Sequence, residues 1–289
     1  MPINRTQDAP SAVQDSAPLS APELVLAAAA FTLALAVSVP ALQGLSHMWR
    51  DSDFYGHAYA IPLVAAYLAW SRRDAIRAAL RPLRPPALGW LAVFGAASFE
   101  VLMILGDVRF AAGVGISLLL GAVAFGTGGW PLLRPLGLPL FFLTLAVPPP
   151  GFLLQQVLFR LKLFVTELAI TILHAAGATV VAEGNTILVP GYTLFVADAC
   201  SGLTSIVTLL PLACVVAYFL SHGVWRRVVV VASVVPLAIA ANVGRVVATV
   251  AMVSRLGTDA AQGLLHESFG LATYVVGTLA VIGVARVLR

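Results

Sequence analysis

Long apolar runs separated by short polar stretches make up most of the chain. A helix rises ~1.5 Å per residue, so about twenty apolar residues cross the hydrocarbon core of a bilayer. The pattern therefore predicts an all-α polytopic membrane protein with about eight transmembrane helices. The predicted spans lie near residues 24–45, 57–70, 87–106, 110–128, 136–148, 200–220, 228–250 and 269–286.

The stretch between the fifth and sixth spans has a different pattern. Residues 152–177 predict an amphipathic helix lying in the membrane interface, because one polar stripe recurs at helical spacing. Residues 178–197 predict a small β-hairpin, because they are rich in β-branched and aromatic residues and contain turn signals. Strands are not left unpaired in lipid, so the hairpin is expected on the outer side. The polar stripe consists of Gln156, Arg160, Glu167, Thr171 and His174.

Composition agrees with a membrane protein, since 60% of residues are hydrophobic, 10% are charged and the mean hydropathy is +0.95. The net charge of +4 comes from short basic loops, which indicates membrane orientation rather than nucleic-acid binding. With a cytoplasmic N-terminus, eleven of the 17 basic residues lie inside and six outside. A crossing at 152–176 is the alternative, but it would put Arg226 and Arg227 outside, against the positive-inside rule.

The first 22 residues are polar and predict a disordered cytoplasmic tail. This tail is too long and too acidic for the start of a signal peptide, so the first span is expected to be a retained anchor. Residues 23–289 are predicted to form a single transmembrane domain that contains the amphipathic helix and the hairpin.

The two cysteines are Cys200 and Cys214, which fourteen residues of helix would separate by ~21 Å. This is several times the reach of a disulfide, and no Cys/His cluster has the spacing of a zinc site. We therefore expect neither a disulfide pair nor a metal. Cys200 lies at the start of a predicted span, which makes its thiol a candidate nucleophile, although a lone membrane cysteine is usually a small packing residue.

Counting along the other helices places two more polar groups at the same depth as Cys200. Asn242 and Arg245 lie on one helix face, and Arg245 is eighteen residues from the basic loop at Arg227. His266 lies twenty residues before Arg286. Each has an ordinary explanation, since Arg245 can anchor a helix end and His266 can be a surface residue, but their common depth favours a shared site.

The three residue types suit acyl transfer. The start of a helix favours the Cys200 thiolate, while Asp198 would oppose it or cap the helix. His266 would take the thiol proton and return it to a leaving amine. Arg245 would stabilise the oxyanion or hold the substrate carbonyl.

Three motifs occur in order: Ala199-Cys-Ser-Gly202 before an apolar run, Asn242-x-x-Arg-Val246, and His266-x-x-x-Gly270 at the final helix. Weaker matches are Glu183-Gly184-Asn185, Pro139-Leu-Phe-Phe142 and the stretch 57–73. Together they cover most of the chain, and they resemble the exosortase and archaeosortase family of membrane cysteine transpeptidases.

The resemblance implies processing of secreted proteins that carry a C-terminal sorting signal, made of a Pro-Glu-Pro-like motif (PEP-CTERM), a membrane helix and a basic cluster. It places the protein in the bacterial inner membrane with its active site on the periplasmic side, linked to exopolysaccharide production and surface assembly. The implied catalytic residues are Cys200, Arg245 and His266, with no metal or organic cofactor. The implied partners are tethered protein substrates and the lipid bilayer; oligomeric state is left open.

Two positions depart from the family pattern. Asp198 stands where family members usually have Glu, and Gly56-His57-Ala58 stands where they have His-Gly. His57, Asn242, Ser201 and Asp198 are candidates for supporting the site or positioning substrate. For His57, a plain loop residue is an equal alternative.

Other functions are also compatible with the pattern. The main rival is a non-catalytic transport or scaffold subunit for polysaccharide export, in which Asn242, Arg245 and His266 line a polar pathway. A lipid-linked glycan ligase would need large charged outer loops, which this chain lacks. An intramembrane serine protease is disfavoured because Ser201 and Ser205 have no Gly-x-Ser-x-Gly context.

Overall fold

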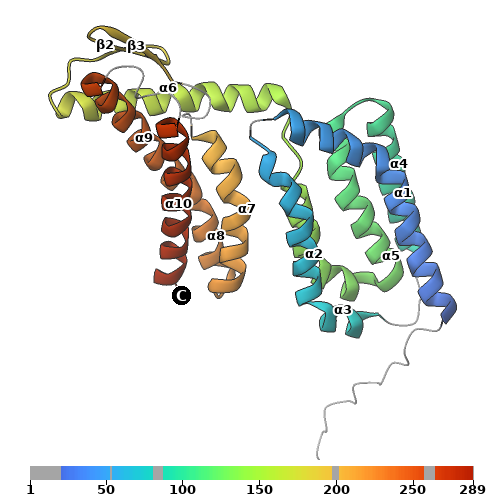
Figure 1. The fold of residues 1–289 in the computed structure, drawn as a ribbon. Coiled ribbons are helices and arrows are strands. Elements are labelled where there is room, and N and C mark those ends of the chain that lie inside the picture. Colours follow the sequence, from blue (N-terminus) through green and yellow to red (C-terminus); the bar gives the residue numbers. More distant parts are fainter. Residues whose placement is uncertain (1–20, 53, 81–86, 197–201, 257–263, 289) are drawn as a thin grey trace, which may run out of the picture. The chain divides into compact units, whose positions relative to one another are not determined.

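The computed structural model describes residues 21–52, 54–80, 87–196, 202–256 and 264–288 (Figure 1). Its elements in the first half are α1 (Ala21–Asp51), η1 (Gly56–Ala60), α2 (Ile61–Ser71), α3 (Arg73–Ala79), α4 (Ala87–Leu105) and α5 (Arg109–Thr144). Those in the second half are α6 (Gly151–Ala175), β1 (Val181–Glu183), β2 (Thr186–Val189), β3 (Tyr192–Phe195), α7 (Leu203–Leu220), α8 (Val224–Ala232), α9 (Val234–Leu256) and α10 (Leu264–Val287).

The predicted all-α membrane fold is confirmed, but its span count of about eight is not. Among the described residues, six helical stretches are long and apolar enough to cross a bilayer. Two features account for the difference. The predicted span 57–70 is the short helix η1 followed by the 11-residue α2, and the predicted spans 110–128 and 136–148 belong to the 36-residue helix α5.

Helix α5 folds back on itself at Gly129. The backbone of Gly129 has φ 64° and ψ −160°, a conformation that glycine adopts without steric cost. A Cβ built on Gly121 would lie 3.4 Å from Leu140 Cδ1 and 3.7 Å from Leu133 Cδ1. In a straight helix Leu140 would be ~28 Å further along the axis, so the halves before and after Gly129 pack against each other.

Contacts divide the described chain into two compact units. The first comprises the residues up to 42 and 65–141. In it α1, α4 and α5 pack around Ala34, Leu119 and Val123. Helices α4 and α5 approach closely, since a Cβ on Gly89 would lie 2.9 Å from the Cα of Gly126. Small residues at such crossings let membrane helices pack through their backbones.

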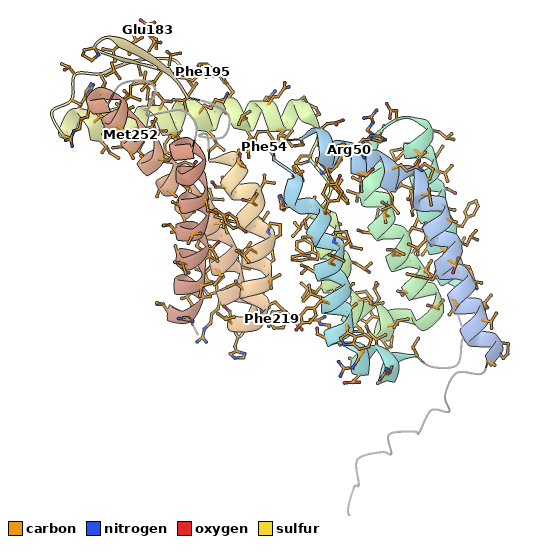
Figure 2. The ribbon with its side chains drawn as sticks, in the orientation of Figure 1. Arg50, Phe54, Glu183, Phe195, Phe219 and Met252 are labelled. Carbon is orange, nitrogen blue, oxygen red and sulfur yellow. The ribbon has the colours of Figure 1, made fainter. Side chains whose placement is uncertain are left out.

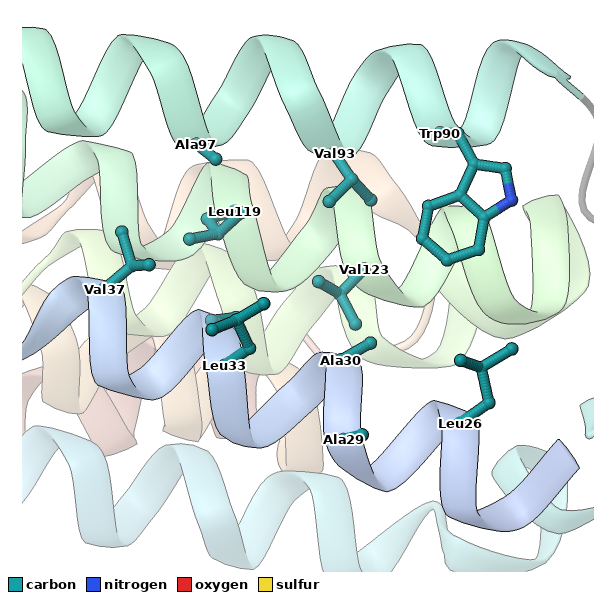
Figure 3. Close-up of a pocket in the computed structure, with 11 residues that line it drawn as sticks. Leu26, Ala29, Ala30, Leu33, Val37, Trp90, Val93, Ala97, Leu119 and Val123 are labelled. Carbon is teal, nitrogen blue, oxygen red and sulfur yellow. The ribbon is translucent and has the colours of Figure 1, made fainter. Parts of the chain in front are cut away.

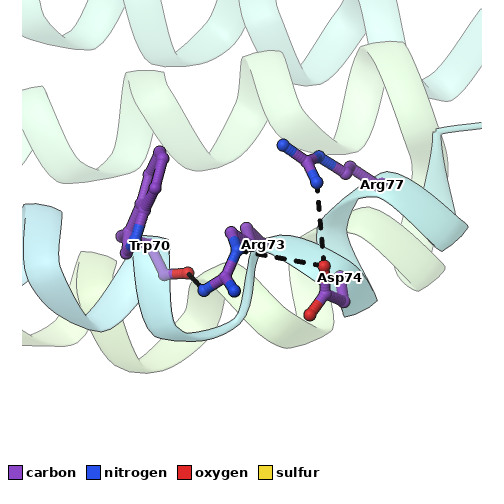
Figure 4. Close-up of polar contacts among 4 residues, drawn as sticks. All are labelled: Trp70, Arg73, Asp74 and Arg77. Atoms are coloured by element: carbon purple, nitrogen blue, oxygen red, sulfur yellow. Dashed lines mark hydrogen bonds and ion pairs between the residues drawn. The ribbon is translucent and has the colours of Figure 1, made fainter.

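Three arginines lie in and directly before α3 in the first unit. Arg73 and Arg77 lie 4.0 and 3.8 Å from the carboxylate of Asp74, and Arg73 also donates to the Trp70 carbonyl (Figure 4). Arg72 donates to the carbonyl of Pro135, just after the break in α5. The α2–α3 corner and the turn of α5 therefore lie at the same end of this unit, as the positive-inside interpretation expects.

The second unit comprises residues 43–64 and 142–289, with α7, α8, α9 and α10 side by side. Their core contains Leu209, Ala213, Val230, Val234 and Val281. Helix α6 lies across one end of these helices (Figure 1). Phe195 and Met252 lie at that end and Phe219 at the opposite end (Figure 2). Since α6 is not apolar enough to count among the candidate spans, an interfacial position suits it.

A helix is confirmed at this place, and its predicted polar stripe is exposed, together with apolar side chains such as Phe159 and Phe164. The opposite face buries Val165, Ala169 and Leu173 against α9 and the strands. The predicted hairpin is instead a three-stranded antiparallel sheet in the order β1-β2-β3. The extra strand exists because both turn signals form turns, with glycines at positive φ: Gly184 at 62° and Gly191 at 83°.

Candidate active site

The first turn of α7 follows the segment that contains the candidate nucleophile. Gly202 caps this helix with φ 88°, in the left-handed region that favours glycine. Cys200, Ser201 and Asp198 lie outside the described residues, so the structure leaves their predicted roles untested. What the structure describes is the helix start that directly follows them.

Asn242 ties α9 to this helix start. Its side chain is fully buried, and its Nδ2 donates to Ser205 Oγ at 3.0 Å and to the Ala238 carbonyl at 2.7 Å. A Cβ built on Gly202 would lie 3.5 Å from the same Nδ2. Asn242 therefore contacts the first turn of α7 at Ser205, five residues after Cys200 in sequence, and lies beside the cap residue Gly202.

Arg245, one turn further along α9, reaches α10. Only 9% of its surface is exposed. A Cβ on Gly270 would lie 3.7, 3.8 and 3.9 Å from Nη2, Nη1 and Cζ of the guanidinium. Gly270 follows His266 by four residues, or ~6 Å of helix. The backbone of His266 belongs to the first turn of α10, and its side chain is outside the described part of the chain.

The electrostatics of this region favour negative charge. Helices α7 and α10 both begin here, and the start of a helix carries a partial positive charge with unpaired N–H groups. The buried guanidinium of Arg245 adds a full positive charge with up to five N–H donors. Such a region stabilises a thiolate or an oxyanion.

His57 is held elsewhere in the second unit, in η1. Its ring stacks on that of Tyr55, with centroids 5.7 Å apart and planes 27° apart. Burial lowers the pKa of His57, so the ring is neutral near pH 7. Burial also raises the pKa of Tyr55 to about 12, so its phenol keeps its proton. The ring contact of His57 is therefore with Tyr55, two residues before it in the chain.

Sequence reasoning missed two contributors to this region. Ser205 was considered only as a candidate nucleophile, yet it accepts the hydrogen bond of Asn242. Gly270 was part of a motif, but nothing in its spacing indicated that it would adjoin a guanidinium.

The described residues contain no group of three or more His, Cys, Asp or Glu side chains placed to hold a metal ion. No curated protein and no solved structure matches the chain. A family model described as transmembrane exosortase matches residues 49–283, a range that includes every candidate residue named above. The chain therefore belongs to the transmembrane exosortase family.

Proposed function

We propose that this protein is a membrane cysteine transpeptidase that cleaves C-terminal sorting signals of secreted proteins. The observation that carries the proposal is the buried Arg245, whose guanidinium adjoins Gly270 one turn from His266. Its neighbour Asn242 contacts the helix start that follows Cys200. Family membership supports the same reaction class.

In the proposed reaction Cys200 is the nucleophile and His266 the acid-base catalyst. His266 takes the proton of the Cys200 thiol, and the sulfur forms a bond to the substrate carbonyl carbon. The C–N bond of the scissile peptide then breaks, and the leaving amine takes the proton from His266. The resulting thioester is resolved by water or by an amine acceptor, which regenerates the thiol.

Arg245 supports this sequence through its charge and its donors. The tetrahedral intermediate carries a negative oxygen, and a guanidinium in a region shielded from water stabilises such a charge strongly. Asn242 acts as a positioning residue, because its bond to Ser205 joins the first turn of α7 to α9, while its bond to the Ala238 carbonyl holds the amide within α9. Ser201 and Asp198 would help to orient the thiol, and His57 would contact substrate.

The proposed substrates are proteins anchored by a terminal membrane helix. A scissile bond just outside such a helix lies at the depth of a catalytic centre formed at helix starts. Helix α6 and its sheet lie across this same end of the bundle, where they would cover the incoming peptide (Figure 1). We place the site at the periplasmic face of the inner membrane, with a Pro-Glu-Pro-type signal and a role in exopolysaccharide-linked surface assembly.

The test is an in-cell processing assay with a secreted reporter that carries a Pro-Glu-Pro-type C-terminal signal. Reporter mass is compared in cells with the wild type, Cys200→Ala and Cys214→Ala. Cys214 is a matched control, because it is a free, half-buried cysteine of α7, the helix that follows Cys200 in sequence. We expect loss of processing with Cys200→Ala alone, with all three proteins present in the membrane.

Equal processing with all three proteins would overturn the cysteine mechanism. The non-catalytic alternative, a transport or scaffold subunit for polysaccharide export, would then come first. It uses the same buried polar residues of α9 as a pathway lining, and it predicts that exopolysaccharide export survives Cys200→Ala but fails with Arg245→Ala.

A further inference from the structure

Among the fully buried side chains that the structure describes, the acidic one is Glu100. It lies inside a membrane-spanning helix, α4. It stands thirteen residues after the start of α4 and five before its end. These separations correspond to ~20 and ~8 Å of helix, so the carboxyl lies within the hydrocarbon layer. Ionisable residues at such depth are rare and commonly functional.

The side chain of Glu100 is enclosed by α1 and α5. A Cβ built on Gly115 of α5 would lie 3.0 Å from both Cβ and Cγ of Glu100, so the acid packs directly on the α5 backbone. Ser38 of α1, itself 1% exposed, lies close to the carboxyl. Within the described residues neither the Ser38 hydroxyl nor the two carboxyl oxygens have a hydrogen bond of full geometry.

An apolar pocket lies next to this group. A pocket of about 280 Å³ lies between α1, α4 and α5, and its lining is almost wholly aliphatic apart from Trp90 (Figure 3). Ala97, one helical turn before Glu100, and Val37, next to Ser38, belong to that lining. The acid and the serine therefore adjoin a medium of low dielectric, where a lone carboxylate carries a large penalty.

No described basic residue of the first unit is placed to neutralise a carboxylate here. The part of α1 in this unit and the whole of α4 have no Lys, Arg or His. In α5, Arg109 pairs with Asp107 at 3.1 Å and Arg134 is exposed. The other basic side chains of the unit that the structure describes belong to the α2–α3 corner, where they bind Pro135, Trp70 and Asp74: Arg72, Arg73 and Arg77.

A bound metal cation is a poorer fit than a proton. Hard cations take about six to eight oxygen ligands. The side-chain oxygens placed together here among the described residues are those of the Glu100 carboxyl and the Ser38 hydroxyl, and no cluster of three or more metal-binding side chains is described. A proton needs only these two groups, because a neutral carboxylic acid donates through its O–H and accepts through its carbonyl oxygen.

We propose that Glu100 is a proton-binding site that stays a neutral carboxylic acid in the folded protein and joins α4 to α1 through the Ser38 hydroxyl. The proton comes from solvent before the helices pack. The acid O–H then donates to Ser38 Oγ, or the acid carbonyl accepts from the Ser38 O–H. This site is separate from the proposed cysteine chemistry and does not depend on it.

The test is infrared spectroscopy of the purified full-length protein in lipid at pH 8, where exposed acids are ionised. We expect a C=O stretching band of a protonated carboxyl in the wild type and its loss in Glu100→Gln, which keeps the shape and neutrality of the acid. A difference spectrum that shows carboxylate bands in place of the acid band would overturn the proposal.

A second variant keeps the test decisive if Glu100→Gln does not accumulate. Ser38→Ala removes the hydrogen-bond partner, so the acid band of the wild type should shift to higher frequency, as expected for a less hydrogen-bonded acid. An acid band that Ser38→Ala leaves unchanged would come from a different carboxyl and would also overturn the proposal. Sorting-signal processing is measured in parallel and should persist in Ser38→Ala.

Discussion

At the scale of single residues, Arg245 combines full positive charge with deep burial in a membrane helix. A charge in that setting is retained where it has partners or a function. Its guanidinium lies beside Gly270 of α10, where a Cβ would be in ordinary van der Waals contact with it. The charge, the planar fork and the small neighbour together suit the binding of a carbonyl or oxyanion.

Replacing Arg245 by Lys should therefore impair processing while preserving the fold. Lysine keeps the charge but loses the planar fork of donors, and loss of one oxyanion donor commonly costs about 10²-fold in rate. The measurement is the rate of reporter processing at equal protein level. Arg255→Lys is the control, because Arg255 is exposed near the end of the same helix. Equal rates for the two variants would remove Arg245 from the proposed chemistry.

Residue-level placement could be predicted only partly from the sequence. The constant rise of a helix locates depth, and Asn242 and Arg245 do lie beside the starts of α7 and α10. Their direct neighbours Ser205 and Gly270 could not be predicted, because contacts between helices depend on helix rotation and on packing of distant segments. The catalytic roles of Cys200, Arg245 and His266 remain predictions.

At the scale of elements, the start of α7 is fixed by a backbone conformation that other residues adopt at a cost. Gly202 has φ 88°, and Gly223, which caps α8, has φ 89°. The two glycines differ in their surroundings. A Cβ at Gly202 would contact Asn242 and the Ala238 carbonyl, whereas a Cβ at Gly223 would have no atom within 4 Å.

Gly202→Ala and Gly223→Ala form a matched pair of variants. Each should lose ~1–2 kcal/mol of stability, because an L-residue with a side chain is strained at positive φ. Only Gly202→Ala should also slow processing, because it displaces the helix start that follows Cys200. Thermal unfolding in detergent and the reporter assay give the two readouts. Equal processing by both variants would show that the position of the α7 start does not matter for activity.

The β element shows what local sequence signals determine. Two turn signals are present, Gly184-Asn185 and Pro190-Gly191, and each forms a turn between antiparallel strands. The prediction of a single hairpin was wrong by one strand, because β1 has only three residues and little alternation to reveal it. By contrast, α6 was predictable in both extent and exposed face, since 25 residues repeat a helical pattern.

At the scale of the whole molecule, the basic residues and the fold together predict a membrane orientation. In the second unit α6 lies at one end of α7, and the α7–α8 corner with Arg226 lies at the other (Figure 1). The positive-inside rule assigns the corner to the cytoplasm and therefore α6 to the outside.

Single-cysteine labelling checks this orientation. His174→Cys at the end of α6 and Arg226→Cys at the start of α8 are made in a Cys200→Ala, Cys214→Ala background, and both positions are exposed. A membrane-impermeant maleimide added to spheroplasts should label the first variant and not the second. Lysed membranes provide the control, since both sites should then react. Labelling of Arg226→Cys in intact spheroplasts would invert the proposed topology.

The number of spans was the least predictable property at this scale. Apolar length alone cannot distinguish a complete crossing from a short helix such as α2, whose 11 residues extend ~16 Å. The hydropathy pattern did separate residues 110–128 from 136–148, and the break at Gly129 lies between them. These two stretches are the halves of α5 on either side of Gly129, and the pattern could not reveal that they fold back against each other.

The fold-back of α5 at Gly129 also bears on how the chain is threaded during synthesis. A hairpin enters and leaves the bilayer on the same face. It therefore adds either two crossings or none, and the chain continues on the side from which it entered. The ends of α5 at Arg109 and Thr144 thus share one face. The side on which α6 and the proposed catalytic centre emerge is consequently set by the helices before α5, and a shallow or a complete insertion of the hairpin gives the same outcome.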